Sequence, residues 1–200
     1  MYPLGTVLVP SMVMPLHIFE PRYRALARRC LEGDRRFGVV LIERGSEVGR
    51  GDVRCGVGTR AEVVQAAELD DGRWLMAVVG VDRIRVDRWL ADDPYPRAEV
   101  TPLPGRPPGD TATDRRHAIE RTLRRVLALR AELGEPAARS TVDLDPDPDV
   151  AAWQAMVLAP LGAFDSQRVL EVVDADDRLD LVAALLDDEA LLLAQRVAGG

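Results

Sequence analysis

The first hundred residues alternate short apolar runs with turn-forming residues, a pattern typical of β-strands. Runs of this kind occupy residues 5–9 and 12–18, and residues 37–42 are continuously apolar, which indicates a strand buried on both faces. Residues 81–89 instead alternate apolar and charged side chains, as expected for a half-exposed strand. Asp71-Gly72 separates two further runs and predicts a tight hairpin turn. We therefore expect about six short strands, with residues 95–103 closing the sheet.

One segment of this half has helical rather than strand spacing. Between Pro21 and Leu31 the apolar residues fall at positions 23, 26, 27, 30 and 31, which places them on one face of a helix. Proline suits the first turn of a helix, and Gly33 is a suitable stop. The sequence thus predicts one helix inserted among the strands.

The second half has helical periodicity throughout. Helices are expected over residues 114–133, 150–161, 166–173 and 176–197. Asp147 followed by Pro148 is a typical helix start, and Asp165 is a candidate cap for the third of these helices. Because the connections are short, we expect a small antiparallel bundle.

A proline- and glycine-rich run at 101–109 separates the two halves. The charge changes at the same place, from a net +1 over residues 1–109 to −8 over residues 110–200. We predict a β-rich lobe at 1–104, a linker at 105–112 and a helical lobe at 113–200. The expected fold class is α+β, with a partly closed antiparallel β-barrel that carries one inserted helix, followed by an α-helical bundle.

The composition excludes several kinds of chemistry. All 26 basic residues are arginine, so the chain has no lysine for a Schiff base, a phosphate-binding loop or a Ser–Lys dyad. Cys30 and Cys55 are too few for a zinc site or a disulfide framework and are expected to be thiols in a reducing cytosol. No run of 18 apolar residues exists, so we expect a cytoplasmic protein without a transmembrane helix, cofactor or metal.

Two features suggest ligands but have simpler interpretations. Aspartates at every second position from 143 to 149 resemble a calcium loop, but that loop needs glycine and glutamate where Pro148 and Gln154 stand. Arginines gather at 22–36 and 83–88, where they could contact RNA phosphates or form a solvated face with ion pairs. No nucleophile, base and orienting group can be assembled into a catalytic set.

Several stretches, taken together and in order, resemble the N-terminal, substrate-binding domain of Lon proteases. The sequence PLGTVLVP at 3–10 leads into PLHIFEPRY at 15–23, as the opening motifs of that family do. The later matches are FGVV at 37–40, GVGTRA at 56–61, GVDRIRV at 80–86 and DPYPRA at 93–98. They span about residues 2–103.

The resemblance implies a PUA-like β lobe followed by a helical lobe. It also implies a stand-alone, non-catalytic domain that recognises exposed or extended polypeptide, as an adaptor for proteolysis or quality control with a protease or ATPase partner. Methionine and aromatic side chains suit a tolerant apolar groove. The candidate peptide-binding residues are therefore Met12, Met14, Phe19, Tyr23 and Trp89, each of which could instead belong to the core.

Two other functions remain open from the sequence. A PUA-like domain could bind RNA or a nucleotide, although the net charge of −7 makes nucleic acid an unfavoured partner. A small molecule could also occupy a cleft of the chain. The oligomeric state is not indicated by any motif.

Overall fold

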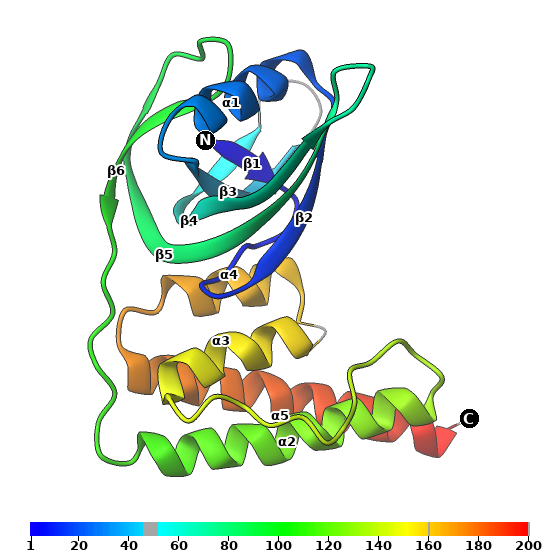
Figure 1. The fold of residues 1–200 in the computed structure, drawn as a ribbon. Coiled ribbons are helices and arrows are strands. Elements are labelled where there is room, and N and C mark those ends of the chain that lie inside the picture. The colour runs from blue at the N-terminus through cyan, green and yellow to red at the C-terminus, as the bar shows by residue number, and fades with distance from the viewer. Residues whose placement is uncertain (46–51, 160, 200) are drawn as a thin grey trace. The chain divides into compact units, whose positions relative to one another are not determined.

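The computed structural model describes residues 1–45, 52–159 and 161–199 (Figure 1). The chain divides into two compact units, Met1–Pro104 and Gly105–Gly200. The first contains the sheet and one helix, and the second contains the remaining helices. Among the described residues, no helix has the length and apolar character needed to cross a membrane.

The first unit is built on one mixed sheet of six strands. The path runs β1–β3–β4–β5–β2, and β6 pairs with β5. The predicted antiparallel arrangement is wrong for β1, which pairs with β3 in parallel, and the partly closed barrel is not confirmed, because within the described residues the path ends at β1 and at β2 without closing. The PUA-like assignment stays a prediction. The strands are β1 (Tyr2–Leu4), β2 (Val13–Ile18), β3 (Arg36–Arg44), β4 (Val53–Glu68), β5 (Trp74–Leu90) and β6 (Arg97–Pro102).

The link between β1 and β2 departs most from the expectation. Residues 5–9 were predicted to form a strand, but the strand is Tyr2–Leu4, and Val7, Leu8 and Val9 are buried outside any strand. The buried Thr59 hydroxyl donates a hydrogen bond to the Leu8 carbonyl. Gly80 gives Val9 room, because a Cβ at residue 80 would lie 2.1 Å from the Val9 carbonyl oxygen. Nonlocal contacts therefore decide the path of this segment.

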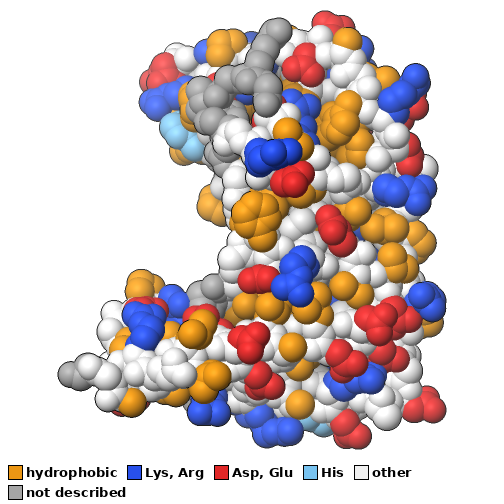
Figure 2. Space-filling model, turned by 180° about the vertical axis from the view of Figure 1, so that it is seen from behind, with side chains coloured by type: hydrophobic (Ala, Val, Ile, Leu, Met, Phe, Trp, Pro, Cys, Tyr) orange, Lys and Arg blue, Asp and Glu red, His pale blue; other side chains and the backbone are white. Residues whose placement is uncertain are grey.

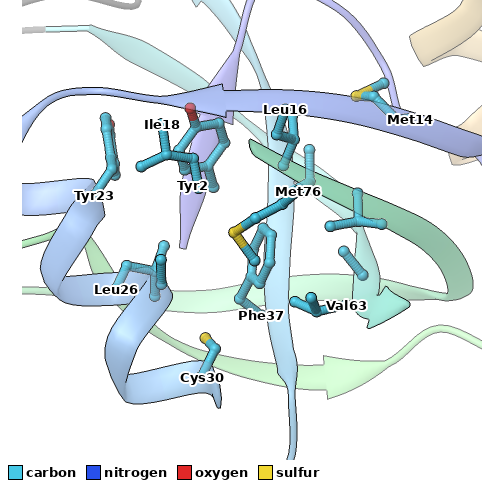
Figure 3. Close-up of a cluster of buried hydrophobic side chains, with 14 of the residues drawn as sticks. Tyr2, Met14, Leu16, Ile18, Tyr23, Leu26, Cys30, Phe37, Val63 and Met76 are labelled. Carbon is cyan, nitrogen blue, oxygen red and sulfur yellow. The ribbon is translucent and has the colours of Figure 1, made fainter. Parts of the chain in front are cut away.

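The inserted helix and the hairpin turn are confirmed. Helix α1 (Pro21–Glu32) buries Tyr23, Leu26, Ala27 and Cys30 against the sheet. These side chains belong to one apolar cluster with Phe37, Val63 and Met76, in which Figure 3 labels Tyr23, Leu26 and Cys30 of the helix. The turn between β4 and β5 contains Gly72 at φ +77°, a conformation that glycine adopts without strain.

The second unit contains the four predicted helices. They are α2 (Ala112–Glu132), α3 (Pro148–Leu158), α4 (Ala163–Glu171) and α5 (Ala175–Gly199). The predicted start of α3 is confirmed, since the Asp147 side chain accepts a hydrogen bond from the Asp149 amide. The predicted cap of α4 is wrong, because the helix starts earlier, at Ala163, and Asp165 lies in its first turn, paired with Arg168.

An arginine lies inside this helical unit. The Arg178 side chain of α5 is only 1% exposed, and its guanidinium donates to the Val172 carbonyl and pairs with Asp149 at the start of α3. It also lies 4.7 Å from the centre of the Trp153 ring. A buried charge needs such partners, since water does not solvate it. Arg178 thus ties α5 to α3 and to the end of α4.

We expect Asp149→Ala to lower the free energy of unfolding by about 3 kcal/mol, because it leaves the buried Arg178 charge without its carboxylate. The matched control is Asp143→Ala, which removes an 88% exposed carboxylate paired with Arg124 and should cost less than about 1 kcal/mol. Urea unfolding followed by circular dichroism measures both. Equal losses in the two variants would contradict the assigned role of Arg178.

We expect Thr59→Val to cost about 1–3 kcal/mol, because the valine is of similar shape but leaves the buried Leu8 carbonyl without its hydroxyl donor. Thr59→Ser keeps the hydroxyl and should retain most of the stability. Denaturant midpoints of the two variants and the parent protein provide the comparison. A Thr59→Val protein as stable as the parent would show that this hydrogen bond contributes nothing.

Candidate functional site

An apolar groove of about 430 Å³ lies along β2. Its lining residues come from β1, from the link between β1 and β2, from β2 and from the following turn into α1. The two strands that border the groove are therefore the two ends of the sheet path. Its apolar lining includes Tyr2, Leu4, Met12, Met14, Leu16 and Phe19.

The alternation of β2 explains which of its side chains reach the interior. Met14, Leu16 and Ile18 are buried, whereas Val13, Pro15 and His17 are exposed. This is the period of two that a strand imposes on its side chains. In Figure 3, Met14 of β2 and Tyr23 of α1 lie at opposite sides of the view, with Leu16 and Ile18 labelled between them. A strand of six residues extends over roughly 20 Å, and this is the length of the groove that β2 can line.

The structure brings four of the five candidate residues together. Met12, Met14, Phe19 and Tyr23 all line the groove. Trp89 is not among the lining residues: it lies near the end of β5, where the guanidinium of Arg54 stacks 4.6 Å from its ring centre. The sequence indicated its aromatic character but not its place in the sheet.

Residues of β1 were missed by sequence reasoning. Tyr2 and Leu4 line the groove, and the Tyr2 and Tyr23 ring centres are 4.5 Å apart. No local pattern predicts this contact, because it depends on how the ends of the sheet are brought together. Leu16 was also missed, although the alternation of residues 12–18 could have indicated it.

Exposure separates the groove into a floor and a rim. Met14 is 5% exposed and Tyr23 is 4% exposed, so both belong to the floor and to the core cluster. Phe19 is 51% exposed, and its ring centre lies 6.1 Å from that of His17. A ligand can therefore reach Phe19 without rearrangement of the core.

At the end of the groove near α1, the opposite charges of Arg22 and Glu20 balance each other. Their side chains pair at 3.1 Å, and the Arg22 guanidinium lies 4.6 Å from the Tyr23 ring centre. Burial raises the pKa of Tyr23 to about 12, against the smaller opposing effect of Arg22. The phenol stays neutral at physiological pH, so the floor of the groove is apolar and uncharged.

A second cavity, of about 490 Å³, lies near the end of α1. Cys30 lines it, and burial raises the pKa of this thiol to about 11. The thiol is therefore protonated at neutral pH and is a poor nucleophile. Within the described part of the chain, no group of three or more His, Cys, Asp or Glu side chains could hold a metal ion.

Many arginines of the first unit are paired with carboxylates. Figure 2 shows acidic and basic side chains interspersed on the visible face. Such pairing neutralises guanidinium groups that an RNA phosphate would need. The structure thus supports the hypothesis that these arginines form ion pairs on a solvated face more than the hypothesis that they contact RNA phosphates. The pairs include Arg28–Glu68, Arg36–Glu62, Arg60–Asp82, Arg85–Asp87 and Arg88–Glu99.

The raised pKa of Tyr23 predicts a loss of stability in alkali. In the unfolded chain the phenol ionises near 10.0, but in the folded protein only near 12. The neutral Tyr23 phenol therefore makes its full contribution to the free energy of unfolding below pH 10, and this contribution is lost as the pH rises towards 12. Tyr23→Phe should show a smaller fall in the free energy of unfolding between about pH 9 and about pH 11, measured by urea unfolding. Identical pH profiles would contradict the assignment.

The model of the ATP-dependent protease La (LON) substrate-binding domain matches residues 1–188. Lon protease 2 of Herpetosiphon aurantiacus is 28% identical over 93% of this chain, which covers 23% of that protein. A LON peptidase N-terminal domain and RING finger protein of Schizosaccharomyces pombe is 26% identical over 86% of this chain, covering 42% of its length. The chain thus spans about a quarter of the first of these relatives.

Solved structures share the fold. The N-terminal domain of Lon protease from the Mycobacterium avium complex superposes with a TM-score of 0.69 at 19% identity, covering 93% of this chain and 97% of that one. A Lon N-terminal domain protein from Xanthomonas campestris gives a TM-score of 0.65 at 24% identity, covering 92% and 95%. The family match over most of the chain and the shared fold agree: the chain belongs to the LON substrate-binding domain family.

Proposed function

We propose that this chain binds exposed or extended apolar segments of polypeptides in the groove along β2. The observation that carries the proposal is a largely apolar groove in which the acidic lining residue Glu20 is paired with Arg22 and whose rim exposes half of Phe19. Membership of a substrate-binding family supports it. The bound segment would place its apolar side chains against Met12, Met14 and Phe19.

Methionine and aromatic side chains suit clients of many sequences. The flexible thioether of methionine adapts to different shapes, and an aromatic ring offers a large apolar contact area. Burial of one large apolar side chain contributes about 1.5–3 kcal/mol, so two such contacts, after the entropic cost of association, are compatible with weak to micromolar binding. Weak and tolerant binding is what a domain that samples many unfolded segments requires.

The proposal is one of binding without chemistry. The Cys30 thiol and the Tyr23 phenol are protonated at neutral pH because burial raises the pKa of each. We further propose that the chain serves proteolysis or quality control by holding clients for a protease or ATPase partner. The Lon proteases to which it is similar support that context.

Phe19→Ser tests the groove. Removal of a ring at the rim should weaken binding of a denatured, fluorescently labelled reporter protein about tenfold, since a contacting aromatic side chain contributes about 1–2 kcal/mol. Fluorescence anisotropy at micromolar concentrations measures the affinity. Phe164→Ser is the matched control, because Phe164 is 62% exposed but lies on α4, in the other unit.

The parent protein and the control should bind alike. If the parent retains no denatured client at micromolar levels, the proposed function is wrong. If Phe19→Ser binds as tightly as Phe164→Ser, the client binds elsewhere on the chain and the groove is not the site.

A further inference from the structure

Strand β2 lies at an edge of the sheet, so half of its main-chain groups face away from its partner. Its one paired strand in the described sheet is β5, with Val13 opposite Val79 and Ile18 opposite Trp74. In an antiparallel pair, successive residues alternate between bonding the partner strand and facing away from it. The groove along this edge therefore contains main-chain groups as well as side chains.

The hydrogen bonds at the start of β2 fix which residues face outward. The Gly80 amide donates to the Met12 carbonyl at 2.9 Å, so Met12 faces β5. By alternation, Met14, Leu16 and Ile18 also face β5. The main-chain groups of Val13, Pro15 and His17 then face the free edge. Pro15 fits this assignment, because proline lacks the amide that an inward position would need.

We propose that a client segment adds to β2 as a further strand, bound by these outward main-chain groups. This inference rests on the proposed function and specifies how the segment binds. The edge offers the carbonyls of Val13, Pro15 and His17, and the amides of Val13 and His17. The occupant is thus an extended polypeptide, since only a main chain supplies alternating donors and acceptors at this spacing.

The side chains of β2 define the class of client. In an added strand, every second side chain points to the face on which Met14 and Leu16 lie, and the others point to the face of Val13, Pro15 and His17. The first set faces the buried part of the groove at Met14 and Leu16, while the second lies beside Pro15 and His17, which also line the groove but are exposed. Preferred segments therefore carry apolar residues at every second position, not at the helical spacing of three and four.

Pro15 limits what the edge can bind. It interrupts the row of donors in the middle of β2, which weakens continuous pairing with another strand. The edge is thus suited to short segments and protected against extended edge-to-edge association. His17, exposed beside Pro15, adds a polar side chain to the same edge.

Backbone methylation of the client tests strand addition on the unaltered full chain. The probes are fluorescent pentapeptides with phenylalanine at alternate positions, N-methylated either at the phenylalanines or at the residues between them. Strand addition predicts that one set of methyl groups weakens binding at least tenfold, whereas the other changes it less than about twofold, because only alternate amides face β2. Which set is sensitive reports the direction of the added strand.

A matched pair of variants tests whether the outward main-chain amide of Val13 in β2 contributes to binding. Val13→Pro removes one outward amide and should weaken binding of the unmodified probe about fivefold, whereas Val13→Thr keeps the amide and should bind within about twofold of the parent. Thermal unfolding midpoints show whether each variant folds. If Val13→Pro does not fold, the methylated probes alone decide the question.

The outcomes distinguish this inference from the proposed function. If the unmodified probe binds and Phe19→Ser weakens it, but both methylated sets behave alike, strand addition is wrong and groove binding stands. If the unmodified probe does not bind at all, both are wrong. A parent protein that self-associates in sedimentation experiments, and a Val13→Pro protein that does not, would assign the edge to a second copy of the chain and overturn the inference.

Discussion

The hydrogen bond from the Thr59 hydroxyl to the Leu8 carbonyl fixes the feature on which the site depends. It holds the buried link between β1 and β2 against β4, while Gly80 lets the same link approach β5. The link connects the two ends of the sheet path, β1 and β2, which are themselves held by pairing with β3 and β5. The groove exists because the ends border a common space without pairing.

The same arrangement gives the groove two kinds of recognition surface. Apolar side chains of the core cluster form its floor, so the residues that stabilise the sheet also make the groove apolar. The outward main-chain groups of β2 form its edge. An unpaired edge carries a risk of aggregation, and Pro15 reduces that risk by removing a donor. Core packing, edge protection and the proposed binding thus depend on one strand.

Charge has a different role in the two units. In the first, arginines pair with carboxylates on neighbouring strands or turns, which leaves the surface charges interspersed (Figure 2). In the second, the buried Arg178 links α3 and α5 from within. Only the arginine of this pair is buried, and the pair matters mainly through the cost of breaking it, because Arg178 would then be an unpaired charge in the core.

Local sequence patterns predicted the strand-rich first half, the inserted helix at 21–31, the hairpin at Asp71-Gly72 and the four later helices, because these depend on local periodicity and on turn and cap residues. Met12, Met14, Phe19 and Tyr23 were chosen as candidates because methionine and aromatic side chains suit a tolerant apolar groove. They line one groove in the structure, and they also lie close together along the chain. The folded structure was needed to show that β1 pairs in parallel with β3, that residues 7–9 are buried outside any strand, that Tyr2 joins the groove and that Trp89 is not among its lining residues. These features rest on contacts between residues distant in sequence, and such contacts leave no local periodic signal.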